Sequence, residues 1–166
     1  RDVFFPVAVP AAKQEKLASL YNYYTELLST ELGKIEDSIV TFNEEASVEM
    51  GALAAADQAR FIAALNAAPN GVIRMSDEIE GVVETSLNVG VITTEENSIT
   101  VLCLIRSLID SGRSQVESML HSLAELAGAS IEFSGAYPGW KPDADSEIMH
   151  IFRDMYEGIY GHKPNI

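Results

Sequence analysis

The residue of this chain whose type and position most clearly suggest chemistry is Arg106. It follows the apolar run from Val101 to Ile105, and by strand alternation it shares a face with Leu102 and Leu104. A guanidinium among apolar neighbours is unfavourable unless it is paired, and its planar fork suits bidentate binding of a carboxylate. The residues alone leave three interpretations open. Arg106 forms an ion pair with an internal Asp or Glu, reaches water at the strand end, or binds the carboxylate of a ligand.

The other residue types that could do chemistry form no recognisable site. Glu117 and Glu125 lie four residues before and after His121 in a predicted helix, a stripe that could hold a metal or form a solvated polar face. His150 and His162 have no carboxylate at ligand spacing on a shared element. Cys103 lies in a predicted buried strand, where a thiol is usually inert. Serine or cysteine triads and glycine-rich nucleotide loops are also missing from the sequence. We therefore expect no metal site and no catalytic residue in this chain.

Composition limits the class of protein. The 166 residues are 47% hydrophobic and 22% charged, which suits one domain with a sizeable core. The net charge is −14, from 11 Lys and Arg against 25 Asp and Glu, which argues against a nucleic acid or an anionic membrane as partner. The single cysteine excludes an internal disulfide and fits a reducing compartment.

The two ends of the sequence lack the usual features of a complete chain. It starts at Arg1 and enters an apolar run by residue 3, with no signal-peptide pattern. It stops at Ile166 without a polar tail. We interpret both ends as cuts through a longer polypeptide; a processed terminus is the alternative.

Hydrophobic periodicity predicts alternating strands and helices. A turn is expected at 69–71, a hairpin loop at 95–97 and a linker at 137–142. In the longest predicted strand, Leu87, Val89 and Val91 should share one face. The strand with Arg106 is almost continuously apolar, which is typical of coverage on both faces. We expect strands at 3–9, 38–44, 82–93, 99–108 and 130–136, and helices at 13–32, 52–68, 113–127 and 147–160.

These elements indicate the α/β (α+β) class: a two-layer sandwich whose sheet is mainly antiparallel. The helices at 13–32 and 113–127 each have one apolar stripe, so we expect both on one face of the sheet. Residues 3–44 and 98–136 both run strand, helix, strand, which indicates a ferredoxin-like arrangement or a chance similarity. We divide the chain into a domain at 1–136, with a helical insertion at about 46–80, and a linker with a further helix at 137–166.

Four stretches together resemble one known family. In this order, the chain resembles the bacterial aminoacyl-histidine dipeptidases (peptidase D, the Xaa-His or β-alanyl-histidine dipeptidases), which are related to carnosinases and aminoacylases. The resemblance covers roughly residues 1 to 166. The stretches are NAAPNGVIR at 66–74, GVVETSLNVG at 81–90, LIRSLIDS at 104–111 and AYPGWKP at 136–142.

The resemblance implies that this chain is most of an inserted lid and dimerisation domain, followed by the first helix of the returning catalytic domain. The family's catalytic domain binds two zinc ions through residues that lie outside both ends of this sequence, so none is expected to bind here. By motif position, the resemblance assigns Arg106 to the carboxylate of the bound dipeptide. It also implies a cytoplasmic homodimer that hydrolyses Xaa-His dipeptides, while the fragment alone should be inactive. The alternative is a non-catalytic ferredoxin-like module for interaction or small-ligand sensing.

Overall fold

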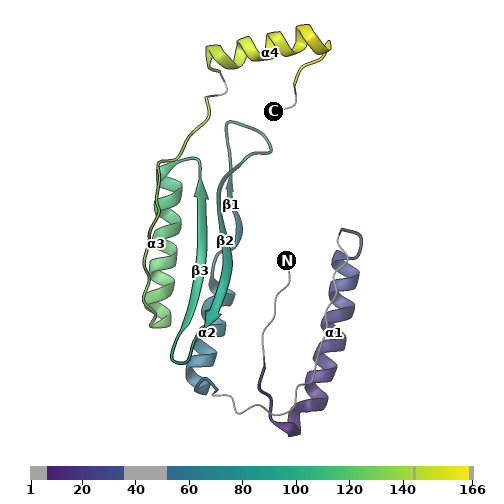
Figure 1. The fold of residues 1–166 in the computed structure, drawn as a ribbon, viewed down its shortest axis with the longest axis vertical. Helices are drawn as coiled ribbons and strands as arrows, with labels where there is room; N and C mark the ends of the chain where they lie inside the picture. Colours follow the sequence, from purple (N-terminus) through teal and green to yellow (C-terminus); the bar gives the residue numbers. More distant parts are fainter. Residues whose placement is uncertain (1–6, 36–51, 144, 165–166) are drawn as a thin grey trace. The chain divides into compact units, whose positions relative to one another are not determined.

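The computed structural model of the chain describes residues 7–35, 52–143 and 145–164 (Figure 1). These residues fall into two compact units, Arg1–Ala54 and Ala55–Ile166, of which the second contains the sheet. None of the helices in the described ranges is long and apolar enough to cross a membrane.

The first unit contains helix α1, Gln14–Leu32, preceded by a 3-10 turn at Ala11–Lys13. This confirms the helix expected at 13–32, although its packing on the sheet stays a prediction. No side chain of α1 is buried. The strand expected at 3–9 lies partly outside the described residues, and its described part, residues 7–9, is irregular. The strand expected at 38–44 lies entirely outside them.

The second unit is built on an antiparallel sheet in the order β1-β2-β3, with β1 at Gly71–Met75, β2 at Val83–Thr94 and β3 at Ile99–Ser107. The two longer strands form the expected hairpin, and its loop is closed by a hydrogen bond from the Glu95 amide to the Ser98 carbonyl, 2.8 Å. The segment expected to be a helical insertion contains both helix α2, Ala55–Ala67, and β1. The sequence analysis missed β1.

Helix α3, Asp110–Ala127, covers one face of this sheet (Figure 1). Its Val116 and Leu120 pack with Leu87 of β2 to form the buried core, and Ile73 and Ile105 lie against that core. The helix expected at 113–127 is confirmed and begins three residues earlier. It ends at Gly128, whose positive φ of 67° makes glycine the suitable residue there. Helix α2 also contacts α3.

Two expectations about strand faces were wrong. Val89 pairs with Cys103, but Val91 pairs with Leu102, so Gly90 is an extra residue that forms a bulge. The bulge moves Val91 to the face opposite Leu87, because side chains alternate with a period of two. The second error concerns β3, which was expected to be covered on both faces. Helix α3 covers one face, whereas Leu102 and Leu104 on the other face are 63% and 52% exposed.

The strand expected at 130–136 is also wrong, since residues 129–142 form neither helix nor strand. A strand needs a ladder partner for its backbone groups, and no described segment pairs with this one. Ile131 and Phe133, expected to point inward, are 37% and 43% exposed. The expected linker at 137–142 is irregular, as predicted.

The last helix, α4, spans Glu147–Tyr160 and confirms the prediction. Ser146 occupies its N-cap position, but its hydroxyl donates to the Asp143 carbonyl instead of capping the helix. Gly161 ends the helix at a positive φ of 73°. The apolar side chains Ile148, Phe152, Met155 and Ile159 are exposed.

Candidate functional site

Arg106 lies at the penultimate position of β3, on the face of the sheet opposite α3. Its backbone pairs with Ser86 of β2, and its neighbours Ile105 and Ser107 belong to the side that faces α3. The predicted sharing of a face with Leu102 and Leu104 is therefore confirmed. We call this surface the open face; it contains Val72, Ser86, Asn88, Val91, Leu102, Leu104 and Arg106.

The guanidinium of Arg106 forms no ion pair with any of the described residues. In the same part of the chain, Arg60, Arg74 and Arg113 each lie within ion-pair distance of at least one carboxylate. Arg106 therefore has no acidic partner for an internal ion pair among these residues. Arg106 is exposed on the open face, where its fork can receive an anion from outside the sheet.

The open face around Arg106 combines polar and apolar side chains: Ser86 lies directly across from it, and Leu104 lies two residues before it in β3. Val72, Val91, Leu102 and Leu104 are all more than half exposed. Contiguous exposed apolar side chains are typical of a surface that another molecule or domain covers. A carboxylate bound beside them would pair with Arg106 in a medium less screened than bulk water, which strengthens the pair.

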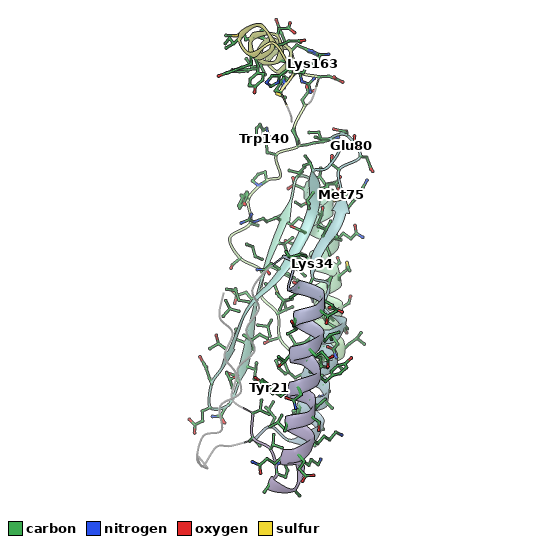
Figure 2. The ribbon with its side chains drawn as sticks, turned by 90° about the vertical axis from the view of Figure 1, so that its right-hand side faces the viewer. Tyr21, Lys34, Met75, Glu80, Trp140 and Lys163 are labelled. Carbon is green, nitrogen blue, oxygen red and sulfur yellow. The ribbon has the colours of Figure 1, made fainter. Side chains whose placement is uncertain are left out.

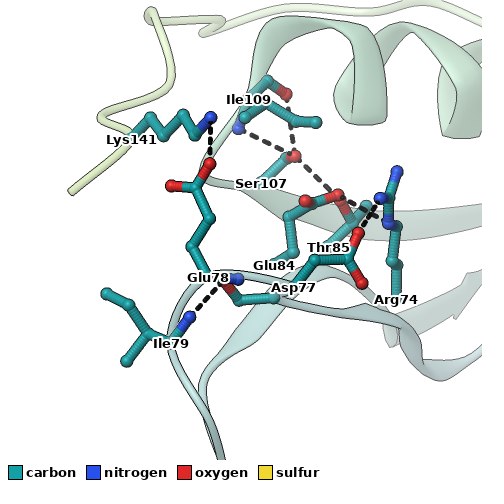
Figure 3. A network of polar contacts seen from close by, with 10 residues as sticks. Arg74, Asp77, Glu78, Ile79, Glu84, Thr85, Ser107, Ile109 and Lys141 are labelled. Carbon is teal, nitrogen blue, oxygen red and sulfur yellow. Dashed lines mark hydrogen bonds and ion pairs between the residues drawn. The ribbon is translucent and has the colours of Figure 1, made fainter. Parts of the chain in front are cut away.

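The opposite side of the sheet holds the end of β3 in place. The hydroxyls of Thr85 and Ser107 lie 2.9 Å apart in a hydrogen bond, and Thr85 is 2% exposed. Ser107 also donates to the Ile109 carbonyl, 2.8 Å, at the start of α3 (Figure 3). A Cβ on Gly112 would lie 2.5 Å from the Thr85 hydroxyl, so only glycine allows α3 to approach this closely. Because Ser107 directly follows Arg106 in β3, this packing also fixes the position of the Arg106 backbone.

A cluster of ion pairs lies in β1, β2 and the loop between them, near the end of β3 (Figure 3). It was not predicted from the sequence. Arg74 of β1 pairs with Asp77 and approaches Glu84 of β2 to 3.4 Å. The hydrogen bond with Asp77, and then the charge of Glu84, raise the pKa of Arg74 above its ordinary value. The Glu84 side chain is only 11% exposed, and its Oε1 accepts no hydrogen bond. The charge of Arg74 therefore compensates the burial of Glu84.

The described residues bring no metal-ligand set together. No group of three His, Cys, Asp or Glu side chains within them could hold a metal ion. Glu117, one member of the stripe around His121, instead lies 3.9 Å from Arg113. Burial raises the pKa of Cys103, which keeps the thiol protonated.

The fold and the open face define an α+β domain that presents an unpaired arginine on one side of an antiparallel sheet. A crystal structure of aminoacylhistidine dipeptidase from Vibrio alginolyticus is similar to this chain: it is 82% identical and superposes with a TM-score of 0.87, over 95% of this chain and 32% of that one. The cytosol non-specific dipeptidase of Escherichia coli (strain K12) is 50% identical over all 166 residues.

The chain spans about one third of the length of these dipeptidases. No family model matches it. The resemblance indicated by the four sequence motifs is confirmed: the chain is similar to part of the aminoacylhistidine dipeptidase over 95% of its length, and to part of the cytosol non-specific dipeptidase over all of it.

Proposed function

We propose that this chain is the lid and dimerisation part of a dipeptidase that hydrolyses Xaa-His dipeptides such as β-alanyl-histidine. The observation that carries the proposal is the similarity to aminoacylhistidine dipeptidase, at 82% identity over 95% of this chain. The structure adds a domain with one packed face and one open face. A lid must present such an open face toward the space that it closes.

Within this proposal, Arg106 binds the carboxylate of the dipeptide. Its guanidinium is exposed and has no carboxylate partner among the described residues, so no internal pair has to break before substrate binds. Leu104, the nearest apolar side chain of the open face, would help to exclude water from the bound pair. Asn88 and Ser86 share the open face, and their amide and hydroxyl are polar groups within the same surface.

The two zinc ions of the proposed enzyme would be held by residues outside this chain. The residues described here do not fit a zinc site, because no three potential ligands lie together. Zinc would supply an activated water for peptide hydrolysis. The contribution of this chain is then substrate binding and water exclusion, and it should not hydrolyse dipeptides by itself.

Association and location are further parts of the proposal. We expect a cytoplasmic homodimer formed through the sheet edge or the helices of this domain, supported by the family resemblance and by the 47% of hydrophobic residues in the chain. The E. coli relative is named a cytosolic protein. Sedimentation of the full-length dipeptidase should give a dimer; monomer at high protein concentration would contradict this part.

The alternative is a non-catalytic module for interaction or ligand sensing. The similarity to parts of two dipeptidases, over 95% or more of this chain, favours the enzyme. The reading frame around this segment discriminates between them: histidine- and carboxylate-rich flanks support the enzyme, and nearby stop codons support the module.

The test of the proposed function is Arg106→Ala in the full-length dipeptidase. We expect kcat/KM for β-alanyl-histidine to fall about 30- to 1000-fold, equivalent to about 2–4 kcal/mol for a truncated charge pair. Arg106→Lys keeps the charge but loses the fork, and should restore only part of the activity. Zinc content and thermal stability should stay unchanged.

A matched control is Arg60→Ala, which removes an exposed arginine paired with Asp57 on α2. It should change kcat/KM by less than about twofold, because exposed ion pairs contribute little. Unchanged activity in Arg106→Ala would show that the carboxylate is bound elsewhere. Unfolding of that variant would instead assign Arg106 to a structural role.

A further inference from the structure

The irregular segment after α3 is attached to the corner between β3 and α3 at Gly139. Its amide donates a hydrogen bond to Asp110 Oδ1, 3.1 Å, at the first turn of α3. A Cβ at this position would lie 2.5 Å from the Leu108 carbonyl oxygen and 2.9 Å from the Ile109 nitrogen. The two backbones are therefore in direct contact, and any side chain larger than hydrogen would separate them.

A second attachment follows two residues later. Lys141 Nζ lies 2.6 Å from Glu78 Oε1, in the loop between β1 and β2 (Figure 3). The hydrogen bond with Glu78 raises the pKa of Lys141. That loop is itself ordered, since Ser76 Oγ accepts hydrogen bonds from the amides of Glu78 and Ile79, both 3.2 Å.

The residue between the two attachments takes no part in them. Trp140 is 84% exposed, and its indole lies at the surface of the segment (Figure 2). The attachment therefore depends on the backbone at Gly139 and the charge at Lys141, and not on burial of an aromatic side chain.

The contacts stop directly after Lys141. From Pro142 onward, the hydrogen bonds within the described residues are local, such as those from the Asp145 amide to Asp143 Oδ1 and from the Ser146 hydroxyl to the Asp143 carbonyl. Helix α4 contacts no other described helix or strand. The chain thus changes from attached to unattached between Lys141 and Pro142.

We propose that residues 138–141 are a strap fixed to the sheet domain, in which Gly139 and Lys141 are positioning residues, and that lid movement pivots beyond Lys141, where these attachments end. This inference rests on the proposed lid function. A strap of this kind transmits the orientation of the sheet, and with it Arg106, to the start of α4. The chain beyond the strap then absorbs the backbone rotation as the lid closes.

Hydrogen exchange and a distance measurement on the full-length dipeptidase test the strap. In the native protein, the Gly139 amide, which donates to Asp110 Oδ1, should exchange slowly and in step with β3. Gly139→Ala should speed exchange of the amide at this position at least about tenfold through the backbone clash. Lys141→Met should speed it only about two- to fivefold, because the pair is exposed.

The distance between spin labels at Thr93 on β2 and Glu157 on α4 reports the pivot. Its distribution should broaden in Gly139→Ala and, less, in Lys141→Met. Asp143→Ala is the matched control: it removes another linker aspartate but lies beyond the strap, so strap exchange should not change. Double substitution Glu78→Gln with Lys141→Met should act no more strongly than either single change.

Rapid exchange of the Gly139 amide in the native protein would overturn the proposal, as would unchanged exchange and distance distributions in both strap variants. Lys141→Met keeps the test decisive if Gly139→Ala fails to fold. These readouts need no activity. Loss of the Arg106 effect with a protected strap would therefore count against the proposed function alone.

Discussion

The two faces of the sheet carry similar apolar side chains but differ in how far these side chains are buried. On the side of α3, Leu87 is 2% exposed and Val116 is fully buried. On the open face, Leu102 and Leu104 of the adjacent strand remain more than half exposed. Strand β3 contributes alternate residues to both faces, so its own apolar pattern does not decide which face is covered. That decision comes from the apolar stripe of α3.

The two faces also differ in the burial and pairing of their polar groups. On the covered face, the Thr85 hydroxyl is buried and paired with Ser107. On the open face, Arg106 has no charged partner among the described residues. Buried polar groups must be satisfied within the fold, whereas an exposed guanidinium is solvated until a ligand binds. The comparison therefore separates residues that hold the domain together from those available for function.

The largest expected difference between the faces is the effect of truncating a leucine. Leu87→Ala should lower the free energy of unfolding by about 2–5 kcal/mol, because it leaves a cavity against α3. Leu104→Ala should change it by about 0.5 kcal/mol or less, as for other exposed sites. Denaturant unfolding of the full-length dipeptidase measures both. Similar losses would show that the open face is covered in the longer protein.

A smaller difference is expected for glycine substitutions. Gly112→Ala places a Cβ 2.5 Å from the Thr85 hydroxyl and 2.7 Å from that of Ser107. It should destabilise the protein by about 1–3 kcal/mol, despite the better helix propensity of alanine. The control is Gly158→Ala in α4, where no atom lies within 4 Å of the added Cβ.

Gly158→Ala should leave stability unchanged or raise it by up to about 1 kcal/mol. Thermal unfolding of the two variants provides the comparison. A stabilising Gly112→Ala would contradict the close approach of α3 to the sheet.

The longer elements were predictable from sequence because their apolar patterns extend over several turns or pairs. Both strands of the hairpin and the helices α1, α3 and α4 were predicted close to their observed bounds. The face of Arg106 was also predicted, since simple alternation from Leu102 to Arg106 meets no bulge. Gly90, an isolated glycine inside a strand pattern, was the available signal for the bulge that moved Val91.

The errors arose where distant pairing decides the structure. Strand β1 has only five residues and register shifts around Arg74, and its pairing with β2 defines it. The segment at 130–136 alternates in the manner of a strand but has no partner among the described residues. The strap at Gly139 depends on a contact with Leu108, and local sequence patterns carry no information about such a contact.

The smallest expected effect concerns the thiol of Cys103 and the pH dependence of stability. Burial raises the pKa of Cys103 above its ordinary value of 9.0. Because the folded state holds this proton more tightly, Cys103 contributes stability that is complete below the unfolded pKa and is lost as pH rises through the folded pKa. The protein should therefore lose a small amount of stability above about pH 9, and the Cys103→Ala variant should not show this loss.

The matched open-face thiol is Leu104→Cys in a Cys103→Ala background. At pH 8, Cys103 in the native full-length protein should react with iodoacetamide at least about tenfold more slowly than the thiol introduced by Leu104→Cys, because only an accessible thiolate reacts. Peptide mapping after timed alkylation gives both rates, and urea should make them equal. Fast reaction at Cys103 would contradict its protection under α3. Slow reaction at position 104 would instead show that the rest of the longer protein covers the open face, so that the proposed binding of a substrate carboxylate by Arg106 would take place only within a closed interface.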